Sequence, residues 1–558
     1  MALTYNEAGY ENSIIELFTQ MGYEHIHGPD IIDERDVKSP FYDEELEDMI
    51  HRLNRKAAPA ARQEALRKLR HIDAGELTLR NETFMDYLQN GISVDYMDKG
   101  EVKSDLIYLV DYDHPDNNSF LIANQWTFVE HSNKRPDILI FLNGIPVVIM
   151  ELKSPSREET EVGEAYRQLR NYMHEIPSLF VYNAFMIISD QLTTKAGTIT
   201  SGLDRFMEWK SVDGSHEDGP LAKFETLFRG MFTKERFLDI LKNFICFSEE
   251  GTFSAKILAG YHQYFAVRKA IASTKRAMGS DGKIGVFWHT QGSGKSLSMV
   301  FYAHLLREVS STVTLVALTD RNDLDNQLYG QFAKCRKFLH QKPEQTENRE
   351  HLKRLLSGKQ ANGIVFSTIQ KFEEEKEPLS TRQDIVVMAD EAHRSQYGLV
   401  EHIRMTKNEK GEAIAKRVVG MARNVRNALP CASYIGFTGT PVSSEDRNTR
   451  EVFGDYIDVY DMTQAVEDGA TRPVYYESRV MALKLDSHVL AQIDEEYDLM
   501  AQRTEPMVIE KSKRELSQME VILGNERTID LLVRDIISHY EKNRAYLLTG
   551  KAMVVAYS

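Results

Sequence analysis

The sequence predicts an α/β protein in which a mixed-sheet domain precedes a domain built on a doubly wound parallel sheet. Three observations support this prediction. After Gly251, short apolar segments alternate with helical patterns, which is typical of a parallel sheet covered by helices on both faces. A glycine-rich loop, residues 290–296, follows the first of these apolar segments. Before Gly251, an apolar hairpin pattern ends in the charged segment Glu151-Leu152-Lys153.

The bulk composition limits the class of protein. At 558 residues the chain is too long for a single core, so we expect three or four domains. The three cysteines form no CxxC pair, which argues against a zinc cluster or disulfide framework and suits a reducing cytoplasm. The start of the chain has no signal-peptide pattern, and the longest apolar run, residues 138–150, is too short to span a bilayer, so we expect no membrane association. The net charge of −16 disfavours nucleic-acid binding by the surface as a whole, so binding would require a local basic surface.

Residues 1–250 predict the mixed α/β domain. Apolar side chains at helical spacing predict a helix over 11–21, and a Glu-, Leu-, Arg- and Ala-rich stretch predicts one or two helices over 44–70. A further helix pattern covers 162–174. Strand patterns cover 105–110, 120–123, 138–142, 145–150 and 180–188.

Residues 251–460 predict the doubly wound domain, and residues 461–558 predict linker helices and the start of a further, incomplete α/β unit. The predicted strands of the second domain are short and apolar on both faces, as buried parallel strands are. They cover residues 284–288, 313–317, 364–367, 385–388 and 434–437. The last part of the chain has a helical pattern over 494–540 and a strand pattern at its end.

The glycine-rich loop, Thr290-Gln291-Gly292-Ser293-Gly294-Lys295-Ser296, predicts an ATP site. It lies between a predicted strand and a predicted helix over 295–306, where backbone N–H groups can converge on phosphate oxygens. Lys295 would then reach the β and γ phosphates, and Ser296 would bind Mg²⁺. The usual GxxxxGK[ST] pattern has glycine where this chain has His289, a substitution that helicases tolerate.

Later motifs support this prediction. Asp390 follows an apolar strand, where its carboxylate can hold Mg²⁺, and Glu391 can polarise the attacking water. Thr438 and Thr440 follow another strand and would sense the γ-phosphate, and Gln263 either reads adenine or is a surface residue. The complete set of predicted ATP-binding residues is Gln263, Gly292, Ser293, Gly294, Lys295, Ser296, Asp390, Glu391, His393, Thr438 and Thr440.

The charged end of the apolar hairpin predicts a second site. Glu151 and Lys153 share one strand face, and Asp137 precedes the partner strand. A two-residue Asn143-Gly144 turn would leave Asp137 and Glu151 on opposite faces, whereas a three-residue loop would make them diagonal neighbours, so we predict the three-residue loop. The two carboxylates could then hold a Mg²⁺ that activates water, with Lys153 orienting that water or neutralising charge. The alternative is a solvated strand end.

The second site resembles that of PD-(D/E)xK nucleases, with Asp137, Glu151 and Lys153 at the motif positions. Gln168 and Tyr172, at i and i+4 on the following helix, match the QxxxY element of the RecB-like branch. The resemblance also implies that Glu11, on the first helix, is a further carboxylate near the metal.

The ATP site resembles that of superfamily 2 helicases of the DEAH-box type, of which this chain would contain the first RecA-like lobe and the start of the second. The resemblance implies DNA phosphate contacts from Thr319, Arg321 and Thr368. It also implies that an arginine from the second lobe is needed for hydrolysis, so this polypeptide alone should bind ATP but hydrolyse it poorly.

A RecB-like nuclease followed directly by a DEAH motor resembles the R subunit of type I restriction–modification enzymes, and the chain resembles an N-terminal part of such a subunit. The family implies a cytoplasmic complex with methyltransferase (M) and specificity (S) subunits, which moves double-stranded DNA with ATP and Mg²⁺ and cuts it at a distance. The alternatives are a DNA-repair helicase–nuclease that needs no methyltransferase and a catalytically silent scaffold. No sequence-reading motif is present, as expected of a motor that grips the DNA backbone.

Overall fold

The computed structural model describes residues 7–72, 75–98, 100–153, 162–190, 192–215, 223–319, 322–357, 363–372, 378–392, 402–407, 413–418, 421–439, 446–473, 476, 526–543 and 553–555. The chain divides into two compact units, Met1–Arg472 and Pro473–Ser558. In the second unit the described helix is α19 (Glu526–Asn543). Within the described residues, no helix is long and apolar enough to cross a membrane.

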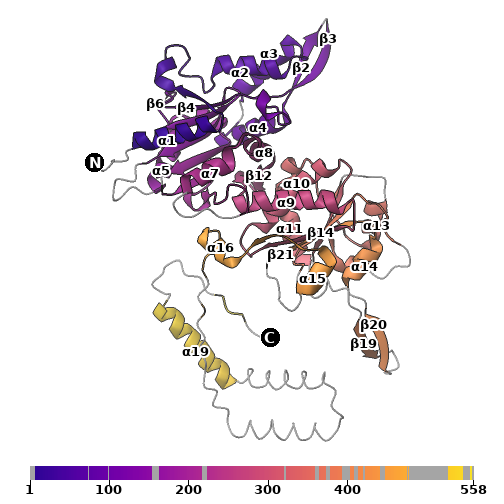
Figure 1. Ribbon diagram of the computed structural model, residues 1–558. Helices are drawn as coiled ribbons and strands as arrows, with labels where there is room; N and C mark the ends of the chain where they lie inside the picture. The colour runs from indigo at the N-terminus through magenta and orange to yellow at the C-terminus, as the bar shows by residue number, and fades with distance from the viewer. Residues whose placement is uncertain are drawn as a thin grey trace. The chain divides into compact units, whose positions relative to one another are not determined.

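The amino-terminal part of the first unit is built on a mixed seven-stranded sheet with the order β1-β4-β7-β8-β9-β10-β11 (Figure 1). β1 pairs in parallel with β4 and β8 in parallel with β9, and the other neighbours are antiparallel. The strands are β1 (Glu24–His27), β4 (Phe120–Asn124), β7 (Ile138–Leu142), β8 (Ile145–Leu152), β9 (Phe185–Ser189), β10 (Thr194–Gly197) and β11 (Met207–Glu208).

Two helical layers cover this sheet. One face of the sheet, with residues such as Ile140 and Met150, belongs to the core that includes side chains of α1, α4, α7 and α8. The other face, with residues such as Leu139 and Ile149, belongs to a separate core with α5 and α6. The helices are α1 (Glu7–Gln20), α4 (Leu77–Asn90), α5 (Val162–Glu175), α6 (Pro177–Val181), α7 (Lys223–Phe232) and α8 (Lys234–Asn243).

The turn between β7 and β8 differs from the prediction. Leu142 pairs with Ile145, so the turn has two residues, and Asn143 and Gly144 both have positive φ, 52° and 76°. This is the combination that type I′ hairpin turns require. A β-bulge compensates, because Phe141 pairs with Pro146 but Ile140 pairs with Val148. The predicted three-residue loop is therefore wrong, and the bulge at Val147 corrects the register in its place.

Smaller elements complete this region. α2 (Asp43–Leu53) and α3 (Pro59–Arg70) follow β1, and the hairpin of β2 (Ile92–Asp98) and β3 (Glu101–Ile107) packs on α3. β5 (Phe128–Val129) pairs with β6 (Asn133–Lys134). β12 (Ile245–Glu250) and β13 (Phe253–Leu258) form a hairpin that leads into α9 (Tyr261–Ala277). The ring of Phe244 contacts Tyr264 of α9 and Phe301, so the apolar core continues from this region into the next.

The second sheet of the first unit is fully parallel, with the order β16-β17-β15-β18-β21-β14-β22 (Figure 1). The strands are β14 (Lys283–His289), β15 (Thr314–Thr319), β16 (Glu344–Gln345), β17 (Ile364–Thr368), β18 (Ile385–Ala389), β21 (Ser433–Thr438) and β22 (Tyr456–Tyr460). The five predicted strands of this domain are all present, and the mixed α/β fold class is confirmed.

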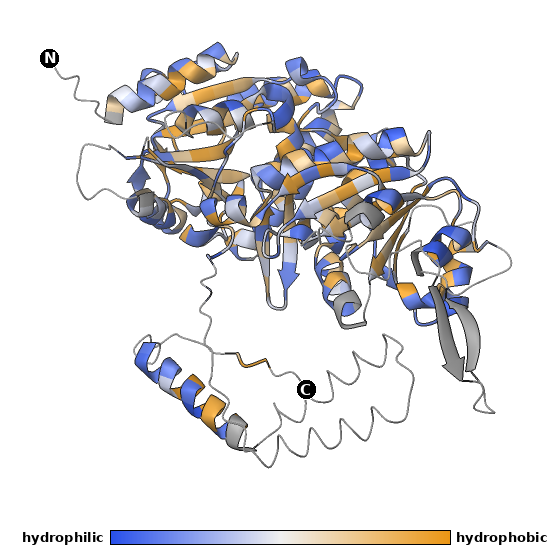
Figure 2. Ribbon diagram, turned by 60° about the horizontal axis from the view of Figure 1, so that its bottom comes forward, coloured by the Kyte–Doolittle hydropathy of each residue, from blue (hydrophilic) through white to orange (hydrophobic). Residues whose placement is uncertain are grey.

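Helices cover both faces of the parallel sheet, as predicted. Alternate strand residues such as Ala317 and Met388 pack in the core with α9, α10 and α11, whereas Val316 and Val387 pack with α13, α14 and α15. In Figure 2 the strands of both sheets are mainly hydrophobic, and the helices carry hydrophilic residues beside hydrophobic ones. The remaining elements are α10 (Lys295–Val309), α11 (Asn322–Lys334), α12 (Arg336–Leu339), α13 (Arg349–Ser357), α14 (Met421–Ala428), α15 (Asp446–Phe453), α16 (Met462–Glu467), β19 (His402–Lys407) and β20 (Ala413–Val418).

Some elements differ from the sequence prediction. Residues 180–188 are not one strand, because α6 ends at Val181 and β9 begins at Phe185. α4 and β22 were not predicted, and the predicted strand over 105–110 begins earlier, as β3. Most of the predicted helical stretch 494–540 and the sheet of the predicted second lobe lie outside the described residues.

Candidate nuclease and nucleotide sites

The bulge in β8 brings Asp137 and Glu151 to the same face of the first sheet. Ile138 pairs with Met150, so Asp137 and Glu151 are directly opposed at the end of the ladder. The Leu152 N–H donates to Oδ2 of Asp137 over 2.8 Å, which fixes that carboxylate against β8. The predicted carboxylate pair thus forms, although through opposed residues and not through the diagonal neighbours expected.

Glu151 lies in an unfavourable electrostatic environment for a carboxylate. Its side chain is fully buried, and burial raises its pKa to about 9, with further increases from the Asp137 charge and a side-chain hydrogen bond to Asp137. Lys153 acts in the opposite direction, because its Nζ donates to Glu151 Oε1 over 2.7 Å. Glu151 Oε2 is buried without a hydrogen-bond donor in the described part of the chain.

The predicted helix residues lie beside this pair. Tyr172 of α5 is buried, and burial is the largest cause of the raised pKa of its hydroxyl. The charges of Glu151 and Asp137 raise this pKa further. The Gln168 side-chain amide donates to the Tyr172 hydroxyl over 2.7 Å. Asp137, Glu151, Lys153, Gln168 and Tyr172 therefore form one group between the sheet and α5.

Glu11 approaches the same end of the sheet from the opposite layer, on α1. Both of its oxygens accept hydrogen bonds, from Asn124 Nδ2 over 2.6 Å and from Gln125 Nε2 over 2.9 Å. Within the described residues, no group of three or more His, Cys, Asp or Glu side chains is arranged to hold a metal ion. The structure therefore places Glu11 near the Asp137–Glu151 pair but does not join it to them.

The carboxylate pair itself fits a divalent cation. Two facing carboxylates with an unpartnered, buried oxygen either share a proton or bind a cation. Carboxylate oxygens are the ligands that Mg²⁺ prefers in proteins. Asp137 and Glu151 are the residues that would hold it, with Lys153 beside them.

The glycine-rich loop has the conformation that phosphate binding requires. Gly292 and Gly294 both have φ of 84°, and Gly294 caps the N-terminus of α10, so the loop backbone turns around a helix N-terminus. His289, at the position of the usual first glycine, is the last residue of β14 and is fully buried. Because His289 has no positive φ, this position does not need glycine.

The acidic motif reaches the same edge of the sheet. Asp390 and Glu391 follow β18. Burial lowers the pKa of Lys295, and the charges of Glu391 and Asp390 partly oppose this shift. A Cβ atom at Gly439, directly after β21, would lie 2.7 Å from Lys295 Nζ, so this segment also closes on the lysine. Thr438 ends β21 next to Trp288 of β14. His393 and Thr440 lie outside the described residues.

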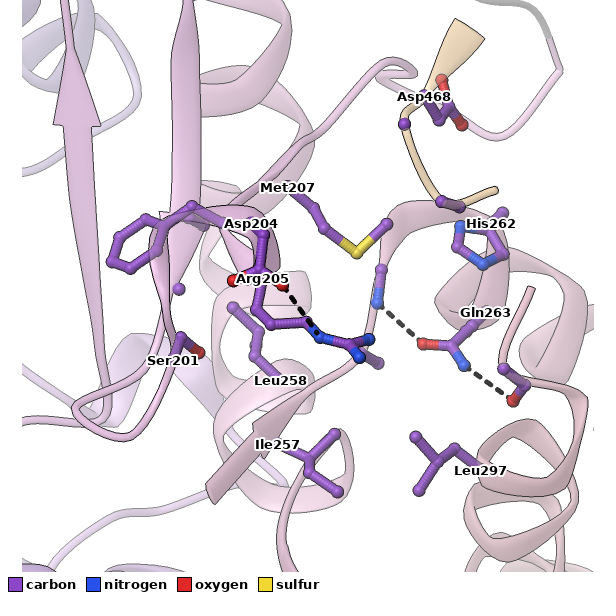
Figure 3. A pocket seen from close by; sticks show the side chains of 18 of the residues that line it. Ser201, Asp204, Arg205, Met207, Ile257, Leu258, His262, Gln263, Leu297 and Asp468 are labelled. Atoms are coloured by element: carbon purple, nitrogen blue, oxygen red, sulfur yellow. Dashed lines mark hydrogen bonds and ion pairs between the residues drawn. The ribbon is translucent and has the colours of Figure 1, made fainter. Parts of the chain in front are cut away.

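Gln263 holds the loop and borders a cavity. Its Oε1 accepts from the Gly260 N–H and its Nε2 donates to the Gly294 carbonyl, each over 3.0 Å. A cavity of about 400 Å³ lies beside Gln263, Gly292 and Gly294. Figure 3 shows Gln263 at one side of this cavity, with Arg205 and Met207 from the amino-terminal region lining it as well.

His262, which the sequence prediction passed over, also supports the loop. Its Nε2 lies 3.1 Å from the Ser293 carbonyl, and its ring stacks on Tyr460 at 4.2 Å. Burial lowers the pKa of His262 to about 4, so the ring is neutral and Nε2 carries the proton that is donated to the carbonyl. The position next to Gln263 was the only signal in the sequence, because the contact with Tyr460 joins residues far apart in the chain.

The predicted DNA contacts are partly described. Thr319 ends β15 and Thr368 ends β17, and the two residues are paired in register, so they lie together at the carboxyl edge of the parallel sheet. Arg321 lies outside the described residues. Ligands of open parallel sheets bind at this edge, where the predicted ATP-binding residues also lie.

The fold and the two sites define a P-loop ATPase domain that follows an α/β domain with a nuclease-type carboxylate pair. Residues 4–205 match the family model described as type I restriction enzyme R protein N terminus, and residues 262–509 match that of the SWI2/SNF2 ATPase. The chain is thus a homologue of the endonuclease (R) subunits of type I restriction enzymes.

Curated relatives agree with these matches. The chain is 36% identical to the type I restriction enzyme HindI endonuclease subunit of Haemophilus influenzae, over 99% of this chain and 53% of that protein. It is 32% identical to the putative type I restriction enzyme MjaIXP endonuclease subunit of Methanocaldococcus jannaschii, over 98% of this chain and 53% of that protein. The chain spans about half the length of these relatives.

Solved structures with a detectable likeness include the type ISP restriction–modification enzyme LlaBIII bound to DNA. That likeness has 12% identity and a TM-score of 0.28, over 59% of this chain and 21% of that chain. A second is a nuclease-deletion mutant of the type ISP restriction–modification enzyme LlaGI in complex with a DNA substrate mimic. That likeness has 16% identity and a TM-score of 0.26, over 47% of this chain and 24% of that chain.

Proposed function

We propose that this chain carries the nuclease and the first motor lobe of the restriction subunit of a type I restriction–modification complex. In this proposal, ATP drives translocation along double-stranded DNA, and a Mg²⁺-dependent site cuts the DNA. The observation that carries the proposal is the combination, in one compact unit, of the Asp137–Glu151–Lys153 group and the Lys295–Asp390–Glu391 group. Residues 1–250, 251–460 and 461–558 are the proposed nuclease domain, first motor lobe, and linker with the start of the second lobe.

At the nuclease site, Asp137 and Glu151 would hold the metal ion. When bound, a divalent ion polarises the scissile phosphate and lowers the pKa of a water molecule. Lys153, which is 13% exposed and donates to Glu151, is the accessible cation of the group and would neutralise charge on the phosphate. Gln168 would hold the Tyr172 hydroxyl in place beside the two carboxylates.

At the motor site, the loop would bind the phosphates of ATP and Lys295 would contact the β and γ phosphates. Ser296 and Asp390 would hold Mg²⁺, and Glu391 would orient the attacking water. The predicted γ-phosphate sensors are Thr438 and Thr440. The cavity beside Gln263 is large enough for a purine base, so Gln263 would border the base while it holds Gly294. Thr319, Arg321 and Thr368 would contact the DNA backbone.

The proposed partners are double-stranded DNA and the methyltransferase and specificity subunits of a cytoplasmic complex. The names of the relatives, which are endonuclease subunits of type I enzymes, support this assignment. Thr319 and Thr368 lie together at the carboxyl edge of the parallel sheet, and DNA-backbone contacts from this edge would suit a motor that leaves sequence reading to another subunit.

The test uses the whole protein that carries this sequence, assembled with its methyltransferase and specificity subunits. Asp137→Ala should abolish DNA cleavage and leave ATP turnover intact, whereas Lys295→Ala should abolish both. Asp116→Ala, at an exposed carboxylate, is the control and should change neither. Cleavage by the Asp137→Ala protein, or loss of its ATP turnover, would contradict the assignment.

A further inference from the structure

A strained turn follows β4 at the edge of the nuclease-type site. Gln125 has φ of 54° and is one of four non-glycine residues with positive φ in the described part of the chain. Such backbone conformations persist only where the surrounding structure holds them, and they occur often at functional sites. The backbone is closely packed here, because a Cβ atom at Gly28 would lie 2.8 Å from the Gln125 carbonyl oxygen.

Gln125 contacts two carboxylate residues at once. Its backbone N–H donates to the Asp137 carbonyl over 3.0 Å, which extends the β4–β7 pairing by one residue. Its side-chain Nε2 donates to Glu11 Oε2 over 2.9 Å. The neighbouring Asn124 donates to the other oxygen of Glu11 over 2.6 Å, so the Glu11 carboxylate has a fixed orientation.

Asp137 is consequently held from both sides. β8 holds its carboxylate through the Leu152 N–H, and the turn after β4 holds its carbonyl through the Gln125 N–H. Glu11, which lies on α1 in the other layer, is connected to Asp137 through Gln125. The left-handed conformation of Gln125 is what lets the backbone face Asp137 while the side chain faces Glu11.

We infer that Gln125 is a positioning residue of the nuclease site, which fixes the Glu11 carboxylate relative to the Asp137–Glu151 pair. The inference rests on the proposed function of that pair as a metal site. Through Gln125, Glu11 anchors the turn whose N–H bonds to Asp137, and contacts that orient a metal ligand in this way raise its affinity for the metal. Gln125 would act through Asp137 and Glu11 and would not itself bind the metal or the DNA.

Two substitutions isolate the side chain of Gln125 from its backbone. Gln125→Gly accepts the positive φ and retains the N–H bond to Asp137, but it removes the bond to Glu11. Gln125→Asn also tolerates positive φ and retains an amide, but its side chain is one methylene too short to reach Glu11. His340→Gly, at another positive-φ residue (49°) remote in sequence and in the motor lobe, is the matched control.

Two properties are measured on the full chain. Mn²⁺ binding is monitored through the electron paramagnetic resonance signal of free Mn²⁺, and stability is measured by urea unfolding in EDTA. For both Gln125 variants we expect Mn²⁺ affinity to fall about 10-fold, the lower end of the usual effect of residues that support metal ligands. In the assembled complex, the Mg²⁺ concentration for half-maximal cleavage should rise by a similar factor, while the rate at saturating Mg²⁺ falls less. His340→Gly should leave the Mn²⁺ affinity unchanged.

Unchanged Mn²⁺ affinity in both Gln125 variants, with or without a loss of stability in urea, would overturn the inference and leave the proposed metal site standing. Wild-type protein that binds Mn²⁺ no better than Glu151→Gln protein would overturn the metal site and the inference together. The two failures are therefore distinguishable in one titration series.

Discussion

Replacing Glu151 with glutamine should stabilise the metal-free protein while it removes the metal site. The pKa of Glu151 is raised from 4.5 to about 9 in the folded protein. Because the folded state binds this proton more tightly than the unfolded chain, stability is lost as the pH rises from 4.5 to 9, by about 1.4 kcal/mol per pH unit. At pH 7, which is 2.5 units above 4.5, the loss is about 3 kcal/mol.

Glutamine at this position has the same shape and carries no charge, so it avoids this loss. Glutamine also weakens the contact with Lys153, which lowers the stability by about 1 kcal/mol. We therefore expect the free energy of unfolding of Glu151→Gln to exceed that of wild type by about 1–2 kcal/mol at pH 7. The gain should vanish near pH 5, where the stability lost by wild-type Glu151 has fallen to about 1 kcal/mol and is cancelled by the weaker contact of glutamine with Lys153. The assay is urea unfolding in EDTA at pH 5 and pH 7, then at pH 7 with Mg²⁺, which should stabilise only the wild-type protein.

Glu175→Gln is the control of opposite sign. Glu175 pairs with Lys134 on the surface, and its hydrogen bonds to Lys134 and Ser132 lower its pKa. A lowered carboxyl pKa gives stability that is present above the unfolded pKa and lost in acid, so this variant should be slightly less stable at pH 7. A Glu151→Gln protein that is less stable than wild type at pH 7 in EDTA would contradict this prediction. Equal stabilisation of the wild-type and Glu151→Gln proteins by Mg²⁺ would also contradict it.

Two further predictions concern the nucleotide loop and the hairpin. Lys295→Ala should weaken ATP binding about 10–100-fold by calorimetry, because a buried charge-assisted contact is lost. The same substitution should leave Mn²⁺ binding at the nuclease site unchanged. An ATP affinity equal to that of the wild-type protein would contradict the assignment of the loop. Gly144→Ala should cost about 2–4 kcal/mol in urea unfolding, because φ is 76° and a Cβ would lie 2.5 Å from Leu46 N. Gly100→Ala, where φ is 87° and nothing lies within 4 Å, should cost only about 1 kcal/mol, and equal costs would show that the packing at Gly144 is unimportant.

The sequence predicted the parallel sheet well because its signals are local. Each predicted strand is a short apolar run, and some lead directly to a predicted site residue, as β18 leads to Asp390 and β17 ends at Thr368. The carboxyl ends of parallel strands meet at one edge, so the order of the motifs was enough to bring these residues together. β22 (Tyr456–Tyr460) was missed because it mixes polar and apolar residues at the border of the sheet.

The nuclease-type site was harder to predict because its register depends on one bulge. The sequence indicated that Asp137 and Glu151 should share a face, and they do, but the turn that achieves this was predicted wrongly. The signal for the bulge at Val147 was Pro146, because proline within a sheet occurs mainly at edges and bulges, and the prediction did not use it. The links among Glu11, Gln125 and Asp137 also join distant residues, so a single sequence could not show them.

The most direct test is diffraction from crystals of this chain soaked in Mn²⁺, with data collected for the anomalous signal of manganese. The account predicts a peak between the carboxylates of Asp137 and Glu151, with metal–oxygen distances of about 2.2 Å, and no such peak in Glu151→Gln crystals. A wild-type crystal with Mn²⁺ bound elsewhere, and with these two carboxylates still in contact through a shared proton, would contradict it.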